Sequence, residues 1–149
     1  MYLRSFFLLL LPLFLLGAQI HFSDPKPTFD HPRKWLIRLN TADKHVVDHT
    51  LGAIYNVLKI YPSDSLEVCV VAYSSGMRAL KKDYDPKLLS KIKSLMDYGV
   101  EFVGCLNTMQ TMHWKKSDFI DGLEFVQAGI AEVIERKVAG WIEVTPYDQ

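Results

Sequence analysis

Residues 66–73 read LEVCVVAY, and the fold prediction depends on them. Every side chain in this segment except Glu67 is apolar, and valine is frequent. A strand with one solvated face alternates apolar and polar residues, whereas a continuous valine-rich run is typical of a parallel strand covered on both faces. The segment therefore predicts a central strand of a parallel sheet with helices on both sides.

Strand and helix patterns alternate on either side of this segment. Residues 43–60 carry apolar side chains at helical spacing. Asp85 and Pro86 form an N-cap followed by a first-turn proline, and Gly99 is suited to end the helix that they begin. The expected strands are 34–40, 66–73, 100–105, 123–126 and 141–146, and the expected helices are 43–60, 86–98 and 128–139, with a short helical or irregular piece near 115–122. This order predicts a single α/β domain, with a mostly parallel five-stranded sheet and helices on both faces.

Residues 1–20 have the pattern of a secretory signal. One cation, Arg4, precedes an apolar run of eleven residues, 6–16, and small residues follow it. This run fits the apolar region of a signal peptide and is shorter than the about 20 residues of a membrane span. We expect an exported protein, periplasmic or secreted, with a cleaved signal peptide. An uncleaved N-terminal anchor is the alternative, and it is the one route by which we expect contact with a membrane.

The remaining chain divides into a linker and a domain. Residues 21–33 contain three prolines and no apolar periodicity, so we expect a linker there and a folded domain over 34–149. The sequence has 17 Lys and Arg against 17 Asp and Glu, a formal net charge of zero. A protein that binds nucleic acid is expected to be strongly basic, so we expect no nucleic-acid partner.

The two cysteines, Cys69 and Cys105, are too few for a scaffold held by disulfides. No Cys-x-x-Cys pair is present, and Thr111 stands where a Cys-x5-Arg phosphatase needs arginine, so both of these thiol chemistries are excluded. Cys69 lies in mid-strand and is expected to fill the core. A Cys69–Cys105 disulfide is conceivable, but it is out of reach if the two strands are not neighbours, as in a 2-1-3 order.

Cys105 is the candidate nucleophile, because it ends a strand just before a helical turn. Ligands gather beyond the carboxyl ends of parallel strands. Backbone N–H groups at such a turn stabilise a thiolate, and Asn107 and Thr108 can donate hydrogen bonds to the sulfur or hold the loop. His113 is a candidate base or charge partner, or else a surface histidine. The alternative for Cys105 itself is a buried structural thiol.

One polar helix face and one loop have no assigned role. His45, His49, Gly52 and Asn56 share the face opposite the apolar stripe of the first helix. Two histidines four residues apart can bind metal, but no third ligand is visible, so we expect no metal. Gly52 in mid-helix suggests a subunit contact. The loop 74–77, SSGM, either lines the same crevice as Cys105 or only forms a turn.

Three segments, at residues 66–80, 99–112 and 126–146, together resemble the DsrE/DsrF-like family of sulfur-relay proteins. Residues 99–112, GVEFVGCLNTMQTM, resemble the family's Gly-Val-x-Phe-x-x-Cys-x-Asn-Thr-Met segment. Residues 66–80 are similar to its second strand and the following loop, and residues 126–146 to its closing segment. Asn56 matches an asparagine late in the family's first helix. The resemblance covers about residues 34–146.

This resemblance implies a DsrE-like fold with a flavodoxin-like three-layer arrangement, assembled into trimers or hexamers. It also implies that Cys105 accepts sulfane sulfur as a persulfide and passes it on, with no cofactor. The leading hypothesis is therefore a sulfur carrier of the sulfurtransferase type, with a sulfur-donor or sulfur-acceptor protein as partner. The rival hypothesis is a non-catalytic oligomeric binding or assembly module in which Cys105 is structural. A flavin-binding protein is disfavoured, because the loop after the first strand, NTADK, lacks a glycine-containing phosphate cradle.

Overall fold

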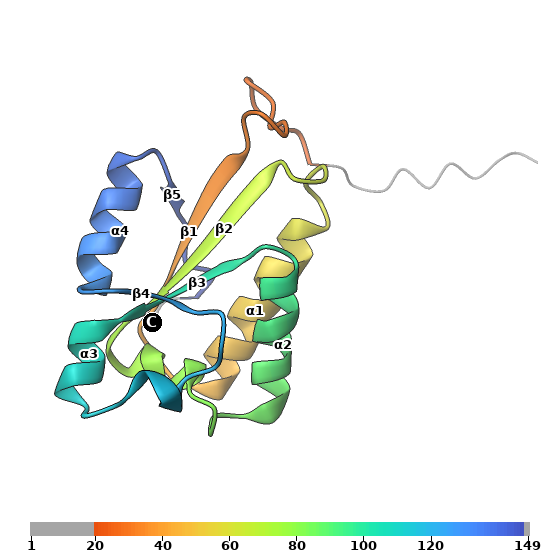
Figure 1. Cartoon of the computed structure of the whole chain (residues 1–149). Coiled ribbons are helices and arrows are strands. Elements are labelled where there is room, and N and C mark those ends of the chain that lie inside the picture. The colour runs from red at the N-terminus through yellow and green to blue at the C-terminus, as the bar shows by residue number, and fades with distance from the viewer. Residues whose placement is uncertain (1–19, 148–149) are drawn as a thin grey trace, which may run out of the picture.

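The structure is a computed structural model, and it describes residues 20–147 (Figure 1). The strands are β1 (Arg33–Leu39), β2 (Leu66–Ala72), β3 (Glu101–Cys105), β4 (Glu124–Val126) and β5 (Ile142–Glu143). The α-helices are α1 (Lys44–Leu58), α2 (Pro86–Asp97), α3 (Leu106–Thr111) and α4 (Gly129–Val138), and the 3₁₀ helices are η1 (Ser74–Leu80) and η2 (Lys116–Asp118).

The five strands form one parallel sheet in the order β4-β3-β2-β1-β5. The chain steps in one direction from β1 to β4, and it then returns across the sheet to add β5 beside β1. Crossovers between parallel strands are right-handed, so helices on steps of opposite direction cover opposite faces. Accordingly, α1 and α2 pack side by side on one face and α4 lies on the other (Figure 1). The predicted α/β fold, a five-stranded parallel sheet with helices on both faces, is confirmed.

The alternation of side chains along the strands divides the core into two layers. Ile37 and Val70 belong to the layer under α1 and α2, whereas Leu36 and Val71 belong to the layer under α4. Cys69 lies in the second layer and is fully buried, so its predicted place in the core is confirmed. Burial raises the pKa of the Cys69 thiol, and the nearby Glu101 carboxylate raises it further.

The register of β2 and β3 separates the two cysteines. These strands are neighbours, which differs from the 2-1-3 order considered above. Cys69 pairs with Glu101, four residues before Cys105 along β3. Four residues of strand span about 13 Å, well beyond the roughly 7 Å that a disulfide bridges. Both thiols are free.

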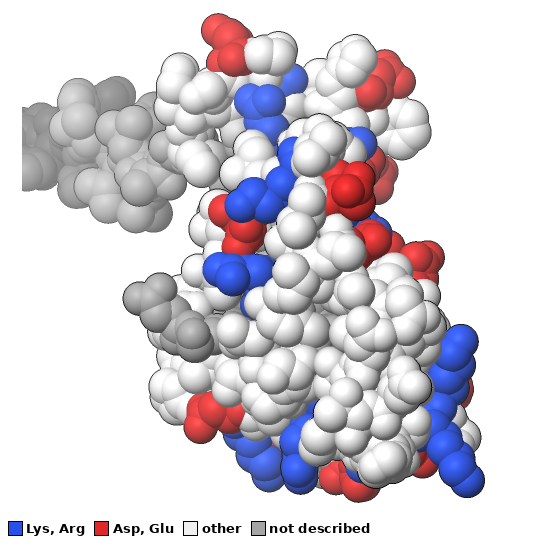
Figure 2. All heavy atoms as spheres, turned by 90° about the vertical axis from the view of Figure 1, so that its left-hand side faces the viewer, with Lys and Arg blue, Asp and Glu red and all other residues white. Residues whose placement is uncertain are grey.

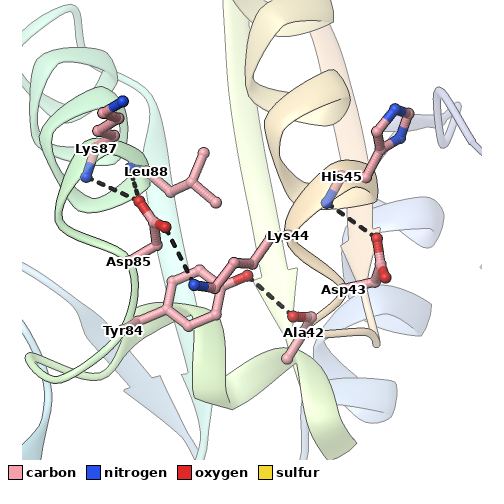
Figure 3. A network of polar contacts seen from close by, with 8 residues as sticks. All are labelled: Ala42, Asp43, Lys44, His45, Tyr84, Asp85, Lys87 and Leu88. Carbon is pink, nitrogen blue, oxygen red and sulfur yellow. Dashed lines mark hydrogen bonds and ion pairs between the residues drawn. The ribbon is translucent and has the colours of Figure 1, made fainter.

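Two aspartates cap and join the helices α1 and α2 (Figure 3). Asp43 and Asp85 each accept two hydrogen bonds from backbone N–H groups in the first turn of their helices. Lys44 Nζ lies 3.2 Å from Asp85 Oδ2, and the Tyr84 hydroxyl donates to the Ala42 carbonyl at 3.0 Å. The bond from Lys44, with those from the backbone, holds the pKa of Asp85 below its ordinary value. The Asp85-Pro86 start predicted for α2 is confirmed.

An arginine of α4 attaches that helix to the sheet. The guanidinium of Arg136 donates to both carboxylate oxygens of Glu101 on β3, at 2.7 and 2.5 Å, and to Glu132 at 2.7 Å. Bidentate arginine–carboxylate pairs fix geometry as well as adding energy. This arrangement holds α4 in one position over β3, and α4 in turn supplies one wall of the site described below.

Ordered contacts precede the first strand. The guanidinium of Arg33 donates to the carbonyls of Ser23 and Pro25 at 2.8 and 2.7 Å, and Phe22 packs edge-on against Tyr61. Between residues 20 and 147, no helix is both long and apolar enough to cross a bilayer. The segment 1–20, predicted as a signal peptide or anchor, lies outside the described residues except for Ile20.

The 3₁₀ helix η1 depends on Gly76. A Cβ atom at this position would lie 2.0 Å from the carbonyl oxygen of Leu39, which is backbone and cannot move aside. We expect Gly76→Ala to lower the free energy of unfolding in urea by about 1–3 kcal/mol, because overpacking a tight core costs this much.

The matched control is Gly52→Ala. Gly52 lies within α1, and apart from its chain neighbours and the adjacent backbone of its own helix, no atom lies within 4 Å of the position of a Cβ. This change should stabilise the chain by about 1 kcal/mol, because alanine is the better helix former. Equal destabilisation by both variants would contradict the account of Gly76. A loss of stability at Gly52 alone would indicate an atom outside this chain at that position.

Candidate functional site

Cys105 lies where the ends of three parallel strands meet. Ala72 of β2 pairs with Gly104, and Cys105 itself pairs with Val126 of β4. Cys105 is the last residue of β3 and the N-cap residue of α3. Only 5% of it is exposed, yet it lines an open cavity of about 760 Å³. The cavity is lined by Tyr73, Ser74, Ser75, Arg78, Cys105, Asn107, Thr108, Thr111, Met112, Trp114, Ala128, Gly129 and Ile130.

Backbone and side-chain bonds fix Cys105 in this position. Its N–H donates to the sulfur of Met77 in η1 at 3.2 Å. Asn107 ties the start of α3 to the loop before α4, because its N–H donates to the Gln127 carbonyl at 3.0 Å and its side-chain oxygen accepts from Gln127 Nε2 at 2.6 Å. The thiol lies 3.9 Å from the Gln127 carbonyl, to which its S–H can donate. The side chain of Asn107 is thus bonded to the loop before α4, and its supporting role for Cys105 stays a prediction.

The surroundings of the sulfur favour the thiolate. Burial is the largest single influence on the pKa of Cys105 and raises it. The Thr108 hydroxyl and the backbone N–H groups of Gly129, Thr108 and Asn107 act in the opposite direction and together outweigh burial, so the pKa lies below its ordinary value. Hydrogen bonds to the charged form have this effect, and the thiolate is the nucleophilic form.

The hydroxyl of Thr108 can accept one hydrogen bond and still donate its proton to the sulfur. The N–H of Ser74 donates to Thr108 Oγ1 at 3.0 Å. A hydroxyl has one proton and two lone pairs, so this bond leaves its proton available for Cys105. Thr108 thus links the loop after β2 to the sulfur. The supporting role of Thr108 for Cys105 stays a prediction, which is tested below.

A glycine makes the close approach of α4 possible. A Cβ atom on Gly129 would lie 3.0 Å from Tyr73 Cβ and 3.4 Å from Cys105 Cβ. Its absence brings the first N–H of α4 close to the sulfur. Gly129 was not singled out from the sequence, although the closing segment that resembles the family contains it.

Arg78 is the only charged residue among those that line the cavity. It is exposed and forms no ion pair with any residue between 20 and 147. From the sequence, the role of the loop 74–77 stayed open between lining the crevice and forming a turn, and no motif pointed to Arg78. Ser74 and Ser75 line the cavity, so the loop belongs to the crevice of Cys105. The position of Arg78 in the segment that follows the carboxyl end of β2 could have indicated a place near the site.

The remaining polar candidates lie elsewhere. His113 is exposed, follows the end of α3 with φ at +56°, and is not among the residues that line the cavity. His45 and His49 lie on α1. In the part of the chain that the structure describes, no group of three or more His, Cys, Asp or Glu side chains is placed to hold a metal ion.

Comparison with known proteins identifies the family. The sequence profile of the DsrE/DsrF-like family matches residues 48–138, which is more than half of the chain. The chain therefore belongs to the DsrE/DsrF-like family, a family known for sulfur relay, and the resemblance inferred from the sequence is confirmed. No curated protein gives a significant match.

Two solved structures are similar in fold. A protein of unknown function from Methanobacterium thermoautotrophicum, MTH1491, superposes with a TM-score of 0.71 at 24% sequence identity, over 76% of this chain and 99% of the other. The ychN protein from E. coli superposes with a TM-score of 0.65 at 16% identity, over 76% of this chain and 97% of the other. At these identities the two likenesses support the fold alone.

The hydrogen bond from Thr108 can be tested through the reactivity of the thiol. We expect Thr108→Val to raise the pKa of Cys105, because a donor to the thiolate is lost. The pH at which alkylation by iodoacetamide reaches half its maximal rate should move upward, and the rate at neutral pH should fall. Thr108→Ser keeps the hydroxyl and should stay close to the unmodified protein.

Thr111→Val is the matched control for this experiment. Thr111 also lines the cavity, but its hydroxyl donates to the Asn107 carbonyl within α3 at 3.0 Å. The alkylation profile of this variant should be unchanged. A profile that moves equally in Thr108→Val and Thr111→Val would contradict a specific role for Thr108.

Proposed function

We propose that this member of the DsrE/DsrF-like family carries sulfur as a persulfide on Cys105 and delivers it to a thiol of a partner protein. The observation that carries the proposal is a thiol that lines an open cavity and has its pKa lowered by surrounding hydrogen-bond donors. A core thiol lacks both properties, and Cys69 in the same chain provides the contrast, since burial raises its pKa.

The chemistry needs two displacement steps. In the first, the Cys105 thiolate attacks the outer sulfur of a sulfane donor. A new S–S bond forms at Cys105, the donor's S–S bond breaks, and the leaving group departs with the electron pair. In the second, an acceptor thiolate attacks the outer sulfur of the persulfide, and Cys105 leaves as a thiolate. The two steps balance without an external oxidant or reductant.

The same hydrogen bonds serve both steps. Cys105 is a nucleophile in the first step and a leaving group in the second, and a lower pKa improves a thiolate as a leaving group. The Thr108 hydroxyl and the N–H of Gly129 are held by the fold before the reaction, so the thiolate is stabilised without reorganisation. The cavity provides room for one further sulfur atom and its donor.

The charge of the cavity favours an anionic donor. Arg78 is the one charged residue in the lining and has no carboxylate partner among the described residues, and the hydroxyl groups of Ser74 and Ser75 lie on the same wall. A guanidinium binds oxyanions through several parallel N–H donors. Thiosulfate is a donor of this class, and its reaction with Cys105 releases sulfite.

The proposal includes assembly and export. α4 presents an apolar stripe of Ile130, Ile134 and Val138, which are 52%, 54% and 79% exposed. Figure 2 shows the face that carries α4, where a broad uncharged area is bordered by charged side chains. An exposed apolar patch of this kind marks an interaction surface, and the trimer or hexamer expected from the sequence would cover it. Residues 1–20 would direct the protein to the periplasm or outside the cell.

One observation favours the alternative function, an oligomeric assembly module with a structural Cys105. The residue is only 5% exposed, whereas the apolar stripe on α4 is widely exposed. In that case Cys105 only fills space in the core, and the function belongs to the exposed apolar stripe on α4. The two functions differ in whether Cys105 takes up sulfur.

Intact-mass spectrometry tests the proposal directly. After reduction and incubation with thiosulfate, the protein should gain the mass of one sulfur atom, about 32 Da, as persulfidated thiols do. The adduct should persist in Cys69→Ser and be absent in Cys105→Ser. If no adduct forms and Cys105 is alkylated only after unfolding, the sulfur-relay proposal is wrong and the assembly module is favoured.

Arg78→Gln tests the charge of the donor. A hydrogen bond to a charged group contributes about 1.5–3 kcal/mol, so persulfide formation from thiosulfate should slow about tenfold or more. Alkylation by anionic iodoacetate should slow as well, whereas alkylation by neutral iodoacetamide should keep its rate. Equal effects on the two alkylating agents would show that Arg78 acts on the thiol and not on the charge of the reagent.

A further inference from the structure

Two histidines of α1 lie in contact at a distance from the cavity of Cys105. His45 and His49 are one helical turn apart, and both are exposed. Their Nε2 atoms are 3.2 Å apart and their ring centroids 4.3 Å apart. The ring of His45 points away from the ion pair of Lys44 and Asp85, so the capping network leaves it free (Figure 3). The two Nε2 atoms therefore lie within hydrogen-bond distance of each other, with the donor set by the tautomer, and a metal ion bound between them would replace the shared proton.

The separation of these two nitrogen atoms matches a chelate. Imidazole nitrogen binds a late transition metal at about 2.1 Å, so two neighbouring ligands are about 3.0 Å apart at a right angle and about 3.4 Å apart at the tetrahedral angle. The observed 3.2 Å lies between these values. Residues four apart face each other on a helix, and the helical backbone therefore holds the two ligands at this spacing.

A tyrosine from the far end of the chain orients one of the rings. The hydroxyl of Tyr147 lies 2.8 Å from Nδ1 of His49, and the two rings meet edge to face with centroids 4.9 Å apart. When Nδ1 carries the proton and donates it to the Tyr147 oxygen, Nε2 keeps a free lone pair. Histidines that bind metals are commonly fixed in this way, by a second acceptor on the other ring nitrogen.

We propose that His45 and His49 form a two-ligand binding site for a late transition-metal dication, with Tyr147 as the positioning residue of His49. The two imidazole nitrogens occupy neighbouring coordination positions, and water fills the others. Because both ligands are nitrogen, the site selects among metals in the order Ni²⁺ over Co²⁺ over Mn²⁺ and does not take Mg²⁺ or Ca²⁺, which prefer oxygen.

The site is independent of the proposed sulfur relay. Neither His45, His49 nor Tyr147 lines the cavity of Cys105. The site is open to solvent, so a donor atom from another molecule can replace the bound water. A metal ion bound by His45 and His49 would also connect the first two turns of α1. Through the bond between Tyr147 and His49, it would strengthen the attachment of the segment after β5 to this helix.

Calorimetric titration with Ni²⁺ tests the site in the full chain carrying Cys105→Ser, which removes the reactive thiol. One ion should bind saturably, with Co²⁺ and Mn²⁺ progressively weaker. His45→Gln and His49→Gln should each remove saturable binding over the range in which the parent saturates. Both changes are at exposed helix positions and glutamine is a good helix former, so folding should be retained.

Two further variants separate this site from non-specific binding. Tyr147→Phe should weaken Ni²⁺ binding about tenfold, as the loss of a partner behind a metal-bound histidine does. His31→Gln, at an exposed histidine outside α1, should change nothing. The proposal is overturned if Ni²⁺ does not saturate, if it binds equally to His45→Gln and His49→Gln, or if His31→Gln weakens it as much as they do.

Discussion

The parallel register of β2, β3 and β4 determines where the Cys105 thiol lies. Since Ala72 pairs with Gly104 and Cys105 with Val126, the three strands end at one edge of the sheet. The segments that leave these ends supply Ser74 and Thr108 around the sulfur. A shift of β3 by one residue would turn Cys105 to the opposite face of the sheet, because side chains alternate. The buried faces on both sides of β3 prevent that shift.

The chemistry of Cys105 follows from a competition between burial and hydrogen bonding. A thiol that is 5% exposed loses hydration when it ionises, and this raises its pKa. Cys69 shows the outcome when burial acts together with a nearby carboxylate. At Cys105 the Thr108 hydroxyl and three backbone N–H groups outweigh burial, so the net shift of the pKa is downward. The same residue type therefore serves as core filler on one strand and as a candidate nucleophile on the next.

Much of this arrangement was predictable from the sequence, because β2 is an almost continuous apolar run and the aspartates Asp43 and Asp85 cap α1 and α2. The position of Cys105 at a strand end followed from the same patterns. Contacts between distant segments did not follow, since no local pattern encodes them. The bond from Ser74 to Thr108, the approach of Gly129 to the sulfur and the presence of Arg78 in the cavity depend on three loops meeting in space. The 3₁₀ helix η1 was missed for a related reason, because its conformation depends on packing around Gly76 and not on a helical periodicity.

The exposed stripe of α4 bears on how a relay at Cys105 would work. An acceptor thiol must touch the outer sulfur of the persulfide, and the low exposure of Cys105 requires it to enter the cavity. Ile130 belongs both to the cavity lining and to the apolar stripe, so a molecule that packs along α4 necessarily borders the cavity. Docking on this surface would exclude water while sulfur is transferred, and water competes for the hydrogen bonds on which the thiolate depends. In the proposed relay, the position of Ile130 at the start of α4 would thus couple partner binding to sulfur transfer.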